Sequence, residues 1–114
     1  MTEHTTATVS IGRNVGAAPM SGDAWTRFQA DIRLALTECG AEIYVDAARS
    51  VGEWEGILED SCTFVASVPL ENLAHLDTDL AYLTRVYRQD AIAVTLGQTQ
   101  FISAESPAIR PALS

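Results

Sequence analysis

Cysteine, histidine and long apolar runs are scarce in this chain, and each shortage argues against a class of protein. The two cysteines, Cys39 and Cys62, stand among apolar residues, where a free cysteine behaves as a small hydrophobic side chain. The two histidines, His4 and His75, are isolated and form no metal-ligand pattern. No run of about 18 apolar residues occurs, so no membrane-spanning helix is expected. We therefore predict a domain that folds without a disulfide, a metal or a cofactor.

Positive charge is also scarce. The chain has 7 lysines and arginines against 15 aspartates and glutamates, which leaves a net charge of −8 at pH 7. Because nucleic acids and anionic lipids attract cationic surfaces, this balance opposes direct binding to either. Residues Met1 to Thr8 hold no basic segment followed by an apolar run, so no signal peptide is expected. Together with reduced cysteines, these features predict a cytoplasmic protein.

The length of 114 residues, 47% of them hydrophobic, suits one domain with one core. We expect this domain to span residues 1–102. The last residues, 103–114, include Pro107 and Pro111 and are expected to form an irregular tail.

The first half of the chain predicts a strand, a loop and a helix. Thr6 to Ile11 alternates polar and apolar residues, which is typical of a strand with one buried face. Gly12 to Gly22 has the composition of a loop, and Ser21 or Asp23 can cap the following helix. That helix is expected to end at Gly40. Its apolar stripe consists of Trp25, Phe28, Ile32, Ala35, Leu36 and Cys39.

Two further strands follow this helix. Ala41 to Ala47 alternates, with Ile43, Val45 and Ala47 on the inner face and Glu42, Tyr44 and Asp46 on the other. Cys62 to Val68 repeats the pattern. Between them, Ala48 to Ser61 is expected to form an extended hairpin arm.

A second helix and a fourth strand complete the pattern. Pro69 is expected to start the helix, which carries a leucine stripe and ends near Gln89. Arg85 and Arg88 lie near that end, where cations complement the helix dipole. Ile92 to Leu96 alternates as a strand, and Phe101 and Ile102 are compatible with a short fifth strand.

The order β-α-β-β-α-β predicts a ferredoxin-like α+β sandwich, in which two helices cover one face of a four-stranded antiparallel sheet. The other face carries Tyr44, Thr63, Val65 and Ser67 and is only partly polar. Dimerisation through the sheet, or a docked partner, would cover it.

The hairpin arm contains the most unusual local sequence, Gly52-Glu53-Trp54-Glu55-Gly56. A tryptophan between carboxylates can anchor a protein partner, because exposed aromatic side chains dominate binding energy at interfaces. The alternative is that Trp54 folds back over the sheet, since a large aromatic usually buries most of its area in its own domain. Our candidate partner-binding residues are Glu53, Trp54, Glu55, Tyr44 and Val65.

A catalytic constellation is harder to find. The carboxylates of the arm and its base lack both the spacing of a calcium loop and a nearby histidine, so a solvated acidic rim explains them better. The carboxylates in question are Glu53, Glu55, Glu59 and Asp60. The two cysteines are expected to be inert, because burial raises the pKa of a thiol.

Three local patterns support a resemblance to a known group of proteins. They are the segment Met20 to Phe28 with its Trp25 and Phe28, the triplet Gly52-Glu53-Trp54, and Glu59-Asp60-Ser61. Over about Val9 to Val68 the chain resembles small accessory proteins of unknown function from actinobacterial phages and prophages. The resemblance implies a phage gene product that acts on a host factor.

The leading hypothesis is a small, non-enzymatic, dimeric interaction module that binds a host protein through the open sheet face or the Trp54 arm. A dimeric ferredoxin-like binder or enzyme for a small ligand is the first alternative, with a cavity near Tyr44, Trp54 and His75. An acidic inhibitor that mimics DNA and binds a basic host protein is the second.

Overall fold

The computed structural model describes residues 3–54, 56–98 and 104. Glu55, the strand considered at Phe101 and Ile102, and almost all of the expected tail lie outside these residues. The elements in chain order are β1 (His4–Gly12), β2 (Asn14–Val15), β3 (Ala18–Pro19), α1 (Gly22–Glu38), β4 (Glu42–Trp54), β5 (Ile57–Pro69), the 3-10 helix η1 (Leu70–Asn72), α2 (Leu73–Val86) and β6 (Ala93–Gly97).

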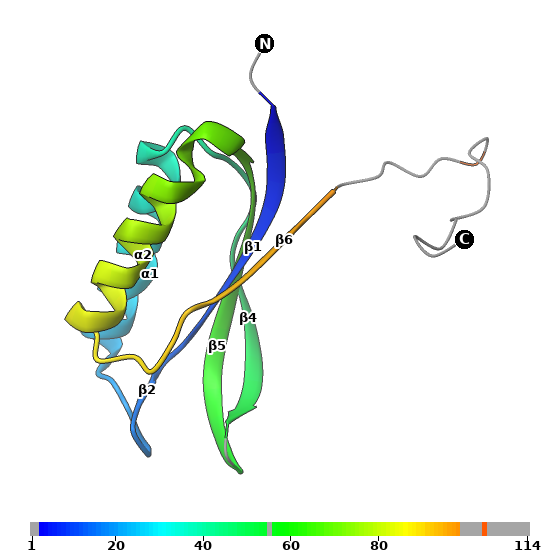
Figure 1. Ribbon diagram of the computed structural model, residues 1–114. Helices are drawn as coiled ribbons and strands as arrows, with labels where there is room; N and C mark the ends of the chain where they lie inside the picture. Colours follow the sequence, from blue (N-terminus) through cyan, green and yellow to red (C-terminus); the bar gives the residue numbers. More distant parts are fainter. Residues whose placement is uncertain (1–2, 55, 99–103, 105–114) are drawn as a thin grey trace.

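The main sheet has four strands in the order β4-β5-β1-β6, and every neighbouring pair is antiparallel. Both helices lie on one face of this sheet (Figure 1). This arrangement confirms the predicted ferredoxin-like α+β sandwich. The first strand of the chain therefore lies inside the sheet, between β5 and β6.

The core lies between the helices and the sheet, and the sequence periodicity explains its membership. Alternate residues of β1 and β5 face the helices, while residues three and four apart on α1 and α2 face the sheet. Phe28 and Phe64 are the largest side chains that are fully buried, and the larger Trp25 is almost fully buried. The core comprises Ala7, Val9, Ile11, Trp25, Phe28, Ile32, Ala35, Leu36, Cys39, Cys62, Phe64, Ala66, Val68, Leu76, Leu80 and Leu83.

Strand β4 departs from the predicted alternation. Register shifts fall between Ile43 and Val45 and between Val45 and Ala48, and each inserts one extra residue on β4. Ala47 adopts a left-handed backbone conformation with φ of 53°. Because the first bulge reverses the side-chain alternation, Val45 pairs with Val65 and is 38% exposed. The prediction that Val45 faces the core is therefore wrong.

The second helix is shorter than predicted. After Pro69 the chain makes the 3-10 turn η1, and α2 begins only at Leu73 and ends at Val86. Pro69 has an extended ψ of 128° and caps η1 without a side-chain hydrogen bond, so the α-helical turns start later. None of the helices in the described part of the chain is long and apolar enough to cross a membrane.

The expected loop from Gly12 to Gly22 contains a small ribbon formed by β2 and β3. Arg13 holds it in place: its backbone N–H donates to the Asp60 carbonyl at 2.9 Å, and its Nε donates to the Met20 carbonyl at 2.8 Å. Ser21 then caps α1, since its hydroxyl accepts the Ala24 N–H at 3.1 Å. The ribbon thus connects the end of β1 to the start of α1.

Candidate interaction site

The sheet face opposite the helices consists of three rows of side chains that run across all four strands. We call these residues the open face. The middle row is Val45, Val65, Thr8 and Thr95, which are directly paired from strand to strand. The flanking rows are Ala48, Thr63, Ser10 and Ala93, and Glu42, Ser67, Thr6 and Gly97.

The open face carries one charged residue, Glu42, at its β4 edge. The chain as a whole is 19% charged, so this face is depleted of charge. Its other side chains are small, and many carry hydroxyls; Ser10 Oγ and Thr63 Oγ1, for example, lie 3.2 Å apart. Depletion of charge is one compositional feature of the centre of a protein interface. Small side chains also allow another surface to approach the sheet closely.

Beyond the open face, β4 and β5 continue together as the hairpin arm, defined here as residues 49–54 and 56–61. The two strands extend below the rest of the sheet (Figure 1). Their pairing runs from Arg49 opposite Cys62 to Trp54 opposite Ile57, and Gly56 turns with φ of 80°. The arm confirms the predicted extended hairpin.

Apolar side chains on the arm are unusually exposed. Val51 is 68% exposed and Leu58 is 70% exposed, and Ile57 at the tip is 40% exposed. Exposed apolar side chains that gather on one element can form a patch to which another protein binds. The arm is therefore the second candidate interaction surface.

The five residues selected from the sequence occupy separate places. Val65 lies in the middle of the open face. Tyr44 is 52% exposed and stands in the first bulge of β4. Glu53 is exposed near the tip of the arm, opposite Leu58, and the backbone of Trp54 pairs with Ile57. Glu55 lies outside the described residues. The structure therefore places Val65 on the open face and Glu53 on the arm, where the backbone of Trp54 also lies.

Sequence reasoning missed most of the open face and the apolar residues of the arm. The polar positions of β1, Thr6, Thr8 and Ser10, alternate with the core residues, and that alternation alone could have placed them on the open face. The contribution of Val45 could not have been found this way, because it depends on a bulge.

The acidic residues at the base of the arm have structural partners. The Glu59 carboxylate accepts the Asn14 N–H at 2.8 Å, and Asp60 lies 3.4 Å from Nη1 of Arg13. A side chain at Gly12 would meet the Glu59 carboxylate, since an added Cβ would lie 2.4 Å from its Oε1. These two carboxylates fix the β2–β3 ribbon against the arm.

The groups considered for nucleophilic catalysis, the two cysteines and His75, do not lie in the surroundings that activate a nucleophile. Both cysteines are buried, and burial raises the pKa of Cys62 to about 11, although the nearby Arg33 guanidinium opposes this shift. Burial also raises the pKa of Cys39. His75 is exposed on α2, with Nε2 at 3.3 Å from Asp79. Within the described ranges, no group of three His, Cys, Asp or Glu residues could hold a metal ion.

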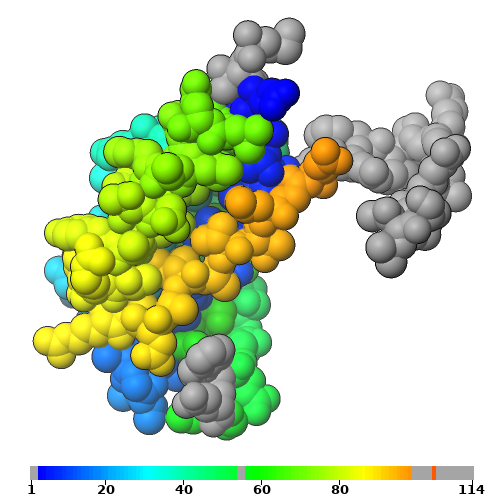
Figure 2. Space-filling model, in the orientation of Figure 1, coloured from blue at the N-terminus to red at the C-terminus, as the bar shows by residue number. Residues whose placement is uncertain are grey.

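A shallow pocket of about 330 Å³ lies where α1 begins and α2 ends. In Figure 2 the blue β2–β3 segment lies directly below the yellow end of α2, so segments distant in sequence meet here. This place differs from the cavity expected near Tyr44, Trp54 and His75. The pocket is lined by Val15, Met20, Ala24, Arg27, Val86, Tyr87 and Arg88.

The fold defines a class: the chain is a small α+β sandwich of the ferredoxin-like type. No protein-family model and no curated protein matches its sequence. Among solved structures, it is similar to a phage SAM lyase in complex with S-methyl-5′-thioadenosine, with a TM-score of 0.55 and 18% identity over 83% of this chain and 81% of that one. It is also similar to a DUF3240 family protein from Shewanella baltica OS155, with a TM-score of 0.54 and 16% identity over 90% and 97% of the two chains. At these identities the likeness shows the fold.

Proposed function

We propose that the protein is a dimeric interaction module, in which the open face binds a second copy of the chain and the hairpin arm binds a different protein. The observation that carries this proposal is the near absence of charge on the open face of a chain with a net charge of −8. Ferredoxin-like sheets leave one face uncovered, and an uncharged face of small residues suits contact with another sheet.

Charge distinguishes a second copy from other occupants of the open face. Two copies repel each other wherever their acidic surfaces meet, and this repulsion is weakest where the surface is neutral. A basic partner would instead be attracted to the acidic parts of the molecule. The neutral open face therefore favours self-association in a two-fold symmetric pair, the commonest form of homo-oligomer.

The arm supports the second part of the proposal. A dimer joined through the open faces would still project its arms, and Val51, Ile57 and Leu58 offer apolar contacts at their ends. The similarity of fold to a phage protein agrees with a role as a phage accessory protein whose arm binds a host protein. Trp54 is then the expected anchor.

The mass in solution tests self-association. Analytical ultracentrifugation of the natural protein should give twice the chain mass of 12.3 kDa. Thr8→Glu places a charge in the middle row of the open face, where two copies would bring the added carboxylates together, and should give a monomer. Thr26→Glu adds the same charge on the exposed surface of α1 and should leave the dimer intact. A natural protein that stays monomeric at high concentration would contradict the proposal.

Capture from a host lysate tests the arm. Trp54→Ala should reduce the yield of a specific bound protein, while the circular dichroism spectrum stays unchanged. Because Trp54→Ala could unfold the domain, Leu58→Ser provides a second variant at a side chain that is 70% exposed. If both variants remain folded and capture the same protein as efficiently as the natural chain, the arm is not the binding surface.

A second candidate function follows from one specific observation, the likeness of fold to a phage SAM lyase bound to S-methyl-5′-thioadenosine. On this view the chain would bind SAM or its nucleoside product. Incubation with SAM, followed by chromatography for S-methyl-5′-thioadenosine, tests it directly. Formation of that nucleoside above the rate in buffer alone would support a lyase, and equal rates would leave the interaction module as the function.

A further inference from the structure

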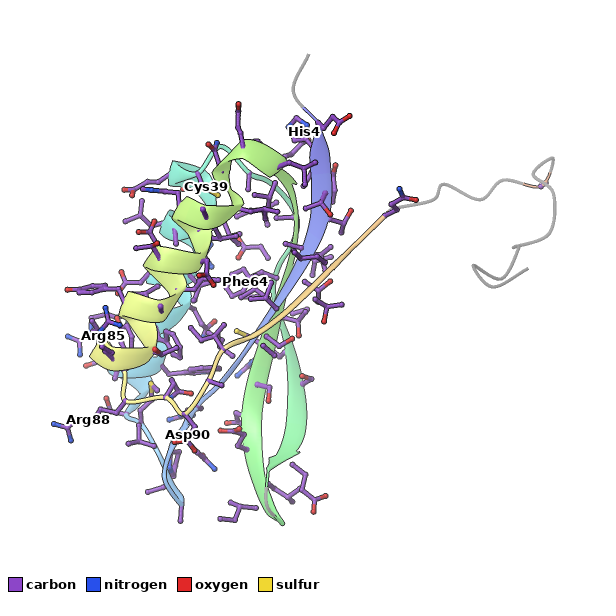
Figure 3. The ribbon with its side chains drawn as sticks, in the orientation of Figure 1. His4, Cys39, Phe64, Arg85, Arg88 and Asp90 are labelled. Atoms are coloured by element: carbon purple, nitrogen blue, oxygen red, sulfur yellow. The ribbon has the colours of Figure 1, made fainter. Side chains whose placement is uncertain are left out.

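The pocket between the two helix ends has an apolar interior and a cationic rim. Val15, Met20 and Ala24 line it from the ribbon and the first turns of α1, and Val86 lines it from the end of α2. Arg27 and Arg88 supply the charged side chains. Both arginines are exposed at the surface, and Figure 3 shows Arg88 extending away from the chain beyond the end of α2.

The walls of the pocket are held by contacts that do not depend on a ligand. The Tyr87 ring stacks on Phe28 with ring centroids 4.4 Å apart, and its hydroxyl donates to Asp31. Gln89 Nε2 donates to the Asn14 carbonyl at 3.1 Å, which ties the end of α2 to the ribbon. A pocket that is formed in advance binds its ligand without the cost of ordering its walls.

The two arginines at the rim are without an acidic partner within the part of the chain that the structure describes. Arg13 and Arg33, by contrast, pair with Asp60 and Asp46. Asp23 and Asp31 lie one turn of α1 on either side of Arg27, but among the described residues no ion pair joins either of them to it, and Asp31 accepts the Tyr87 hydroxyl. In a chain with 15 acidic residues and 7 basic ones, two arginines without a paired carboxylate on one pocket mark a place where an anion is favoured.

Arg88 also has a backbone conformation that does not suit an arginine. Its φ is 53°, in the left-handed region, at the position after the helix end where glycine is preferred. The cap itself is made by backbone groups: Gln89 N–H donates to the Thr84 carbonyl at 2.8 Å, and Arg88 N–H donates to the Arg85 carbonyl at 3.4 Å. Helix termination therefore does not require this side chain. Strain of this kind is a pointer to function.

We propose that this pocket binds a small organic anion, with an aromatic or branched apolar body against Val15, Met20 and Val86 and with its acidic group held by Arg27 and Arg88. A guanidinium matches the planar geometry of a carboxylate and also binds sulfonate and phosphate oxygens. The volume of about 330 Å³ is large enough for a ligand of up to three rings. This site is separate from the open face and the arm, and its occupant does not depend on the function proposed for them.

Two fluorescent probes that differ in one group test the proposal. The probe 8-anilinonaphthalene-1-sulfonate carries an apolar body and an anion, and N-phenyl-1-naphthylamine has the same rings without the anion. The double variant Arg27→Gln/Arg88→Gly should bind the sulfonate at least about tenfold more weakly than the natural protein, since two charge-assisted contacts are lost. Binding of the neutral probe should change by less than about twofold. Arg88→Gly alone should not lower the melting temperature, because glycine suits the left-handed position.

Arg85→Gln is the matched control. Arg85 also lies at the end of α2, but it faces Tyr82 at 6.0 Å and does not line the pocket, so sulfonate binding should not change. Three results would overturn the proposal: no binding of the sulfonate to the natural protein, equal binding by the double variant, or an equal loss of both probes. The last would mean that the arginines support the shape of the pocket and do not bind the anion.

Discussion

At the scale of single residues, the side chain of Tyr87 links the two helices. It joins α2 to α1 through the stack on Phe28 and through its hydroxyl, which donates to the Asp31 carboxylate. Burial, followed by this hydrogen bond, raises the pKa of Tyr87 to about 12 from the ordinary value of 10.0. The protonated phenol is thus the form that the folded protein favours.

This pKa predicts how stability depends on alkaline pH. Because the folded value lies above the unfolded one, the stabilisation is fully present below pH 10.0 and is lost as the pH rises towards about 12. In Tyr87→Phe the ring stack remains, and the steep loss of stability over this range should become shallower. Urea unfolding at several pH values measures how steeply the free energy of unfolding falls with pH. In the variant, the absorbance at 295 nm, which reports ionisation of tyrosine, should no longer show the titration step at about pH 12. An unchanged dependence of stability on pH would show that the raised pKa of Tyr87 is not the cause of the loss.

The buried cysteines give a second prediction at this scale. Both thiols are enclosed by the core, and burial raises the pKa of each. At neutral pH they should react with 5,5′-dithiobis(2-nitrobenzoic acid) far more slowly in the folded protein than in guanidinium chloride, because only an accessible thiolate attacks the reagent. A fast reaction of either thiol in the folded protein would show that the helix layer opens easily.

Burial of the cysteines could be predicted from their apolar neighbours, whereas the roles of several polar residues could not. Glu59 and Asp60 looked like members of an acidic rim, yet they bind Asn14 and Arg13, which follow the neighbouring strand β1. Arg88 could be explained by the helix dipole alone, and its place on a pocket depends on the ribbon formed far earlier in the chain. Contacts between residues distant in sequence leave no local pattern.

At the scale of elements, Gly12 controls how the ribbon meets the arm. A Cβ at this position would overlap the Glu59 carboxyl group, whose carboxylate accepts the Asn14 N–H. Gly12→Ala should therefore displace the carboxylate, which stands at the end of a flexible side chain, and lower the free energy of unfolding by up to about 1.5 kcal/mol, the net contribution of one hydrogen bond. Urea unfolding measures this change.

Gly97→Ala is the control for this prediction. Gly97 also lies at a strand end, but nothing stands within 4 Å of an added Cβ, so the variant should be close to neutral. If Gly12→Ala were equally neutral, the contact between Glu59 and Asn14 would contribute little to stability.

Periodicity predicted every long element, because a buried face imposes a period of two on strands and of 3.6 on helices. The prediction from periodicity failed where the regular spacing of apolar residues is interrupted. The two bulges of β4 turn Val45 outward, and η1 delays the start of α2. The β2–β3 ribbon was expected to be a loop, since two-residue strands are too short to show alternation.

At the scale of the whole molecule, net charge sets how copies of the chain meet. Two chains of charge −8 repel at long range, and the open face, with Glu42 as its one charged residue, adds little to this repulsion in the proposed dimer. Raising the ionic strength from about 0.01 M to about 0.15 M shortens the Debye length from about 30 Å to about 8 Å. The dissociation constant of the proposed dimer should therefore fall as salt is added. Sedimentation equilibrium at several salt concentrations measures it, and weaker association in salt would indicate ion pairs across the interface instead.

The central place of β1 in the sheet affects how the chain folds as it is synthesised. Its two neighbours come much later: His4 pairs with Pro69, and Thr6 pairs with Gly97. A nascent chain therefore cannot complete its sheet until nearly the whole domain has left the ribosome, and until then the apolar residues of β1 lack their partners. Such distant pairings make folding slow. The edge of β1 that faces β6 stays unpaired until the last strand has been made, so the sheet is completed late.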